Sequence, residues 1–139
     1  MQKKHTGGIY IFFSILIIIC VWAINSVPLF SDYGKETELY LKNYSSECKI
    51  IKTDKNGFLA EIYKTGEATV INNSDVDKIL KDFSAETVFY EEVGDITEIY
   101  AFSKKIRYKK SVGGKIVNLH IIKNKTTIKV GSPIIFGSF

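Results

Sequence analysis

The longest apolar stretch of the chain lies close to its N-terminus. Residues 9–30 carry no charged side chain and follow a short basic tail. About 20 apolar residues are enough for a helix to cross the hydrocarbon core of a bilayer. The pattern therefore predicts a cytoplasmic tail at 1–8, a transmembrane anchor at 9–30 and a polar domain at 31–139.

A cleavable secretory signal is the alternative interpretation of this segment. Lys3 and Lys4 precede the apolar run, and Ala23 or Ser26 closes a candidate cleavage site. The run is longer than usual for a signal peptide, and bulky residues crowd both sites, which favours an uncleaved anchor. In either case the positive charges precede the segment, so the N-terminus is expected inside and the domain outside the cytoplasmic membrane.

The polar domain shows the alternation of apolar and polar residues that is typical of strands. Gly and Asp residues separate the apolar segments at positions that suit hairpin turns, such as Thr65-Gly66, Gly94-Asp95 and Gly113-Gly114. The predicted strands are 48–51, Phe58–Tyr63, Glu67–Ile71, Thr87–Glu92, Ile96–Phe102, Ile106–Val112, Lys115–Ile122, Thr126–Val130 and Pro133–Phe136.

Two segments of the domain read as helices instead. The first is a short helix within Glu36–Ser46. The second begins at Ser74, whose side chain can cap free backbone N–H groups, and continues to Phe83 with apolar residues at helical spacing. The expected fold class is α+β: an N-terminal transmembrane helix followed by a mostly antiparallel sheet with one or two packing helices.

The hairpin around Gly113-Gly114 makes the most specific structural prediction. A two-residue loop at these glycines places Tyr108 opposite Leu119 and Arg107 opposite His120. One face of the hairpin is then apolar and the other is basic, and the alternation agrees in both strands. We therefore expect His120 on the surface of a basic sheet face.

Charge divides the chain into two unlike parts. Residues 32–98 contain fifteen acidic residues against eight lysines, whereas 99–139 contain nine basic residues and no acidic residue. Two interpretations are open. The two parts can interleave in the fold and neutralise each other across strands, or the basic part can form a face that docks an anionic surface.

The composition points to an exported bacterial domain. Only Cys48 lies in the exported part, so that part has no internal disulfide. Eighteen lysines against one arginine, with abundant isoleucine and asparagine, indicate an AT-rich genome. Together these features favour a low-GC Gram-positive bacterium.

No residue pattern predicts catalysis, a cofactor or a metal site. His120 is the single histidine of residues 31–139, so a zinc site of histidine and cysteine is not expected. Cys48 is expected to be a buried structural thiol. Glu91, Glu92 and Asp95 resemble an acidic cluster, but adjacent carboxylates of a strand point to opposite faces. We expect a solvated turn there and a protein that is not an enzyme.

A basic segment with interleaved rings is the candidate binding surface. Exported domains rarely meet nucleic acid, so the expected partners are the membrane, an anionic envelope polymer or an acidic partner protein. The predicted contact residues are Lys104, Lys105, Arg107, Lys109 and Lys110, with Phe102 and Tyr108 as aromatic anchors.

The last third of the chain resembles a known family. Ile99–Ser103, Gly114–Leu119 and Val130–Ile135, with Phe139 at the end, are similar to the C-terminal signature of the YwmB-like proteins. The resemblance implies an exported protein of spore-forming Gram-positive bacteria, a link to sporulation, and a curved antiparallel sheet like that of the TATA-box-binding protein. It implies no activity and no catalytic residues.

These features favour a membrane-anchored extracytoplasmic domain that acts as a non-enzymatic binding or assembly component at the cell envelope. One alternative is a minor pilin-like component of a secretion or DNA-uptake apparatus, in which the apolar helix continues into the domain. The other is an enzyme of wall metabolism, which requires Glu91 or Glu92 beside another acid in a cleft.

Overall fold

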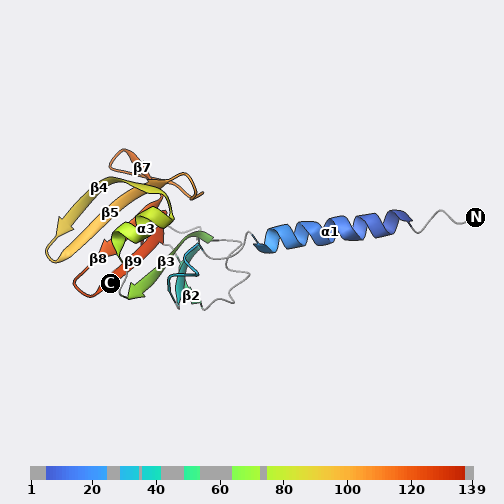
Figure 1. The fold of residues 1–139 in the computed structure, drawn as a ribbon, viewed down its shortest axis with the longest axis horizontal. Helices are drawn as coiled ribbons and strands as arrows, with labels where there is room; N and C mark the ends of the chain where they lie inside the picture. The colour runs from blue at the N-terminus through green and yellow to red at the C-terminus, as the bar shows by residue number, and fades with distance from the viewer. Residues whose placement is uncertain are drawn as a thin grey trace, which may run out of the picture.

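The computed structural model contains an isolated N-terminal helix and a domain built on one large sheet (Figure 1). The helix α1 (Thr6–Ile24) lies apart from the sheet, and the helix α3 (Val76–Asp82) packs against it. The structure describes residues 6–24, 29–34, 36–41, 49–53, 64–72 and 75–136.

The predicted transmembrane anchor at 9–30 is wrong. Within the described ranges no helix is long and apolar enough to cross a membrane. The helix ends at Ile24, and Phe30, which the prediction placed in the anchor, is buried in the core of the domain.

The sheet has seven strands in the order β2-β1-β3-β9-β8-β5-β4, and every neighbouring pair is antiparallel. A separate two-stranded ribbon joins β6 to β7. The strands are β1 (Thr37–Leu41), β2 (Lys49–Thr53), β3 (Lys64–Asn72), β4 (Ala85–Val93), β5 (Ile96–Ser103), β6 (Lys110–Val112), β7 (Lys115–Val117), β8 (Leu119–Lys123) and β9 (Thr127–Ser132).

The antiparallel sheet and the presence of the second helix agree with the sequence prediction. The N-cap of this helix is Asp75, however, where Ser74 was predicted, and the predicted turn at Thr65-Gly66 lies inside β3.

The first predicted helix is wrong. Thr37–Leu41 forms β1 and not a helix, because it pairs with β2 on one side and β3 on the other. The remainder of that predicted helix, at 42–46, and the predicted strand at 58–63 lie outside the described residues. Pro133–Phe136, predicted as a strand, forms none.

The glycine hairpin keeps the predicted register over a shorter length. Gly113 and Gly114 both have positive φ, at 57° and 77°, and Lys110 pairs with Val117. Pairing stops there, because β8 joins the large sheet between β5 and β9. His120 consequently lies opposite Tyr100 and not opposite Arg107, so the predicted basic face of this hairpin is wrong.

The core occupies both faces of the sheet. On one face α3 buries Ile79 and Phe83 against Leu119 and other aliphatic residues of β8 and β9. On the opposite face a smaller cluster joins Tyr40 and Ile135. The covered faces explain why these strands are apolar over several successive positions and do not alternate strictly.

Leu119 tests the position of the main core. Its side chain is fully buried, so we expect Leu119→Ala to lower the free energy of unfolding by about 2–5 kcal/mol. Ile116→Ala is the matched control, because Ile116 is 52% exposed and its loss should change stability by about 0.5 kcal/mol or less. Urea unfolding of both variants checks this, and equal destabilisation would contradict the assigned core.

Candidate binding surface

The predicted contact residues lie in the connection between β5 and the β6–β7 ribbon, which we call the basic connector (residues 104–110). It begins with a turn after Ser103 and continues without strand pairing until Lys110. Buried side chains on both sides of this turn determine its course, so the connector has a defined shape although it lies at the surface.

Asn118 holds the start of the basic connector in place. Its side chain is fully buried and accepts a hydrogen bond from the backbone N–H of Ser103 at 2.7 Å. Its amide group donates to the carbonyl oxygens of Ser103 at 2.7 Å and of Ile106 at 3.0 Å. One buried side chain thus bonds three backbone groups around this turn, of which the Ser103 carbonyl oxygen also accepts from the Ile106 N–H at 3.4 Å.

Ser103 connects the basic connector to the end of α3. Its hydroxyl donates to the carbonyl oxygen of Phe83 at 2.5 Å and accepts from the backbone N–H of Lys105 at 3.1 Å. The ammonium group of Lys105 donates to the carbonyl oxygen of Asp82 at 3.2 Å. The turn is therefore fastened to the helix as well as to the sheet.

The five predicted cations are all exposed, and the two predicted rings are half-buried. Two cations lie over aromatic rings: the Lys109 ammonium is 5.3 Å from the centroid of Phe102, and that of Lys110 is 4.8 Å from Phe136. Such cation–π contacts at exposed sites contribute roughly 0.5–1 kcal/mol and orient the lysine stems. Phe102 is thus partly covered by the lysine that was predicted to act beside it.

A row of stacked rings lies next to the basic connector and was not predicted. Phe89 stacks on Tyr100 with centroids 4.4 Å apart, and Tyr100 stacks on His120 at 4.3 Å. The ammonium of Lys115, from the β6–β7 ribbon, lies 5.2 Å from the Phe89 centroid. The residues come from β4, β5, β7 and β8, so the stack forms only when these strands assemble.

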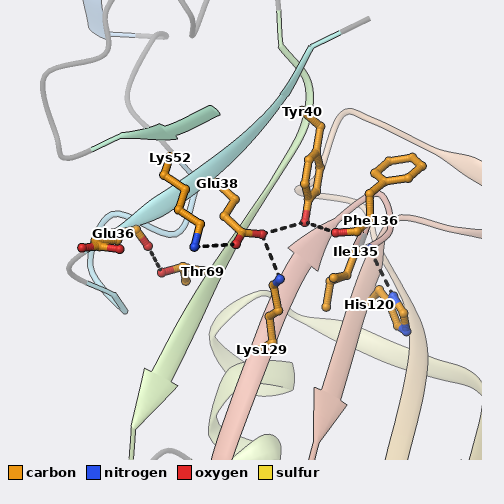
Figure 2. Close-up of polar contacts among 9 residues, drawn as sticks. All are labelled: Glu36, Glu38, Tyr40, Lys52, Thr69, His120, Lys129, Ile135 and Phe136. Carbon is orange, nitrogen blue, oxygen red and sulfur yellow. Dashed lines mark hydrogen bonds and ion pairs between the residues drawn. The ribbon is translucent and has the colours of Figure 1, made fainter. Parts of the chain in front are cut away.

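His120 is buried, which corrects the expected surface position. It is 4% exposed, and its Nδ1 accepts a hydrogen bond from the backbone N–H of Ile135 at 3.2 Å (Figure 2). Its Nε2 lies 3.3 Å from a carboxylate oxygen of Glu98. Burial lowers the pKa of His120 below 6.5 and outweighs the nearby Glu98 carboxylate, which raises it.

Glu98 also binds the neighbouring tyrosine. The Tyr100 hydroxyl donates to the same carboxylate at 2.8 Å. Burial, followed by this bond and the charges of Glu98 and Glu91, raises the pKa of Tyr100 above its usual value of 10.0. Tyr100 therefore stays a neutral hydrogen-bond donor.

Acidic and basic parts of the chain meet inside the sheet. The buried ammonium of Lys129 lies 2.8 Å from Glu38, to which the Tyr40 hydroxyl also donates, at 3.4 Å (Figure 2). At the opposite end of the domain, Lys125 pairs with Asp95 at 2.7 Å. Interleaving therefore neutralises some of the charge of both parts, and the exposed cations of the basic connector remain as a separate surface feature.

The buried carboxylate of Glu67 fastens the segment that follows α1. Glu67 is 2% exposed and lies 2.6 Å from the ammonium of Lys64. It also accepts a short hydrogen bond from the backbone N–H of Leu29. The charge of Glu67 is thus paired, and the bond ties residue 29 to the start of β3.

One cavity of about 440 Å³ lies beside the start of β1. A hydrogen bond of 2.6 Å from the Thr69 hydroxyl to the Glu36 carbonyl closes one side of it. Glu38 in its lining pairs with Lys129 at 2.8 Å and lies 4.0 Å from Lys52, which also lines the cavity. Its lining residues are Tyr33, Gly34, Glu36, Glu38, Lys52, Thr69 and Val70.

The described residues contain no group of three or more histidine, cysteine or acidic side chains that could hold a metal ion. Glu91, Glu92 and Asp95 are exposed at the β4–β5 turn, as the sequence predicts. Cys48, predicted to be a buried thiol, lies outside the described residues.

Comparison of the chain with protein-family models, with curated proteins and with solved structures found no match. The resemblance to the YwmB-like proteins therefore stays a prediction.

Replacing Asn118 should loosen the start of the basic connector. Asn118→Ala removes the side-chain partner of the Ser103 N–H and of the Ile106 carbonyl oxygen, at roughly 1–3 kcal/mol of unfolding free energy for each one that water does not reach. Amide hydrogen exchange at Ser103 should accelerate in this variant. Ile116→Ala is the matched control, because Ile116 lies two residues earlier in β7, is 52% exposed and makes none of these hydrogen bonds, so the Ser103 amide should stay protected. Unchanged exchange in Asn118→Ala would contradict the role assigned to Asn118.

The stability of the domain should depend on the protonation of His120. Because burial lowers its pKa in the folded state, the unfolded chain binds the proton more tightly. The stabilising contribution is complete above pH 6.5, the unfolded value, and is lost as the pH falls from there through the lower folded pKa. Asn retains an acceptor near Nδ1 and does not titrate, so His120→Asn should lose less stability on acidification. Parallel pH slopes of the unfolding free energy in both proteins would contradict this.

Proposed function

We propose that this protein is a non-enzymatic binding or assembly component of the cell envelope, and that its basic connector binds an anionic envelope component. The observation that carries the proposal is the exposure of all five cations within seven consecutive residues of a connection held by buried hydrogen bonds. A fixed cluster of positive charge attracts anions more strongly than the same charges on a mobile tail, because less ordering is needed on binding.

The charge distribution supports the same proposal. From Ile99 to the end of the sequence there is no acidic residue to compensate the connector locally. The described acids that pair with this part of the chain, Glu38, Asp95 and Glu98, contact Lys129, Lys125 and His120 and not the connector.

The helix α1 supports a location at the membrane. It is apolar on all sides, and residues 8–21 are exposed throughout. A helix of this kind needs an apolar environment, which lipid supplies. The proposal requires that α1 contacts lipid, and it does not require that α1 crosses the bilayer. Placement of the domain on the outer side, and the link to sporulation that the family resemblance implies, are parts of the proposal that rest on the sequence alone.

The pilin-like alternative is less well supported. It requires the apolar helix to continue into the domain so that helices pack along a fibre. Here α1 ends at Ile24, and residues 29–33 form turns before β1 begins at Thr37. Recovery of the protein in sheared surface fibres would favour this alternative.

Neutralising the basic connector should weaken binding to the envelope. The test variant carries five substitutions: Lys104→Gln, Lys105→Gln, Arg107→Gln, Lys109→Gln and Lys110→Gln. We expect it to lose most of the salt-sensitive binding to isolated cell envelopes, which is the binding seen at low salt and removed by added salt. Screening by salt identifies the electrostatic part of the binding. Co-sedimentation of the full chain at low and raised ionic strength measures it.

A second fivefold variant controls for net charge. It replaces exposed lysines elsewhere in the domain, at Lys52, Lys78, Lys81, Lys123 and Lys125, by glutamine. This variant should bind nearly as well as the original chain. Equal binding by both variants at low salt would remove the basic connector as the contact surface.

A further inference from the structure

The fold places the basic connector at the end of the domain to which α1 is attached. We infer from this that the connector docks on the anionic phospholipid headgroups of the membrane that α1 contacts. The inference rests on the proposed function, and it names lipid phosphate as the anion that the connector binds.

Strand register shows that the connector and the attachment point share one end of the sheet. Leu29, the first described residue after α1, is bonded to Glu67 near the start of β3. Glu67 pairs with Ser132 at the end of β9. Two strands further along the sheet, β5 ends at Ser103, where the connector begins. The β4–β5 and β8–β9 turns lie at the opposite end.

Side-chain contacts show that the segment after α1 and the basic connector lie close together at this end of the sheet. The Phe30 ring lies edge-on to Phe83, with centroids 5.4 Å apart. The Tyr33 hydroxyl donates to the Asp82 carboxylate at 2.6 Å, and Lys105 donates to the carbonyl oxygen of the same residue. The segment after α1 and the start of the basic connector therefore both contact Asp82 at the end of α3.

Covalent geometry limits how far α1 can be from this point. Ile24 ends the helix, and Leu29 is fixed to Glu67. Five residue steps separate them, and a fully extended chain spans at most about 3.6 Å per residue, or roughly 18 Å. If α1 lies in lipid with Ile24 at the headgroup layer, Leu29 is within roughly 18 Å of that layer, and closer wherever the connection is not fully extended.

The short connection between Ile24 and Leu29 favours headgroup phosphates over other anions as the first partner of the connector. Charges interact effectively over roughly 8–10 Å at ordinary ionic strength, so only anions near this end of the domain matter. Headgroup phosphates are held there by the same contact that places α1 in lipid. Wall polymers must instead reach into the gap between domain and membrane. Basic residues beside a membrane contact are attracted in this way to anionic leaflets.

A competition between two kinds of vesicle tests the inference on the full chain. Dense sucrose-loaded vesicles contain phosphatidylcholine and phosphatidylglycerol, and light vesicles contain phosphatidylcholine alone. The contribution of α1 to binding is the same for both kinds of vesicle. The ratio of protein bound to dense vesicles over protein bound to light vesicles therefore measures the electrostatic contribution to binding. Lys104→Gln with Arg107→Gln should lower this ratio about thirtyfold, as expected for the loss of two cations near a charged surface. Lys105 is left in place because it bonds to α3.

Lys123→Gln with Lys125→Gln is the matched control at the opposite end of the sheet. It removes the same charge, and the one ion pair it breaks, Lys125 with Asp95, is exposed. It should leave the ratio nearly unchanged. Equal effects of both variants, or no preference of the original chain for dense vesicles, would overturn the inference.

If the original chain shows no preference for dense vesicles but still binds isolated envelopes through the connector cations, the proposed function stands. The partner is then a wall polymer or an acidic protein. Failure to bind either vesicle would contradict lipid contact by α1 itself.

Discussion

The hydrogen bonds of the buried Asn118 side chain are the constraint on which the basic connector depends. They fix the backbone on both sides of the turn after β5, and the hydroxyl of Ser103 extends the same network to the end of α3. Without them, repulsion among the five cations would favour more open conformations of the turn, although Ile106 packs in the core. The buried side-chain amide of Asn118 thus gives the cationic segment 104–110 a defined shape.

The basic connector lies beside the segment that joins α1 to the domain. Phe30 and Tyr33 pack on the helix end that Lys105 also reaches, so the apolar segment and the basic connector are neighbours although about seventy residues separate them in the sequence. One end of the domain thus combines an apolar contact with a cationic one. Lipid bilayers offer the matching pair of an apolar interior and an anionic surface.

The sequence predicts the antiparallel sheet and the presence of α3, because these follow from alternation and helical spacing. It fails where distant strands decide the outcome. The sequence of β1 predicts a helix, and only its pairing with β2 and β3 makes it a strand. The sequence around His120 predicts a surface residue, and only the position of β8 between β5 and β9 buries it. The burial of Phe30 likewise depends on Phe83, which lies far along the chain. No local pattern marks Asn118, whose role depends on a turn fifteen residues earlier.

The central claim is that the connector lies against anionic lipid when α1 is in contact with the bilayer. Amide hydrogen exchange of the full chain, bound first to neutral and then to anionic vesicles, tests this most directly. The account predicts that exchange slows in residues 104–110 on anionic vesicles and not at the β8–β9 turn. Equal exchange of the connector on both kinds of vesicle would contradict it.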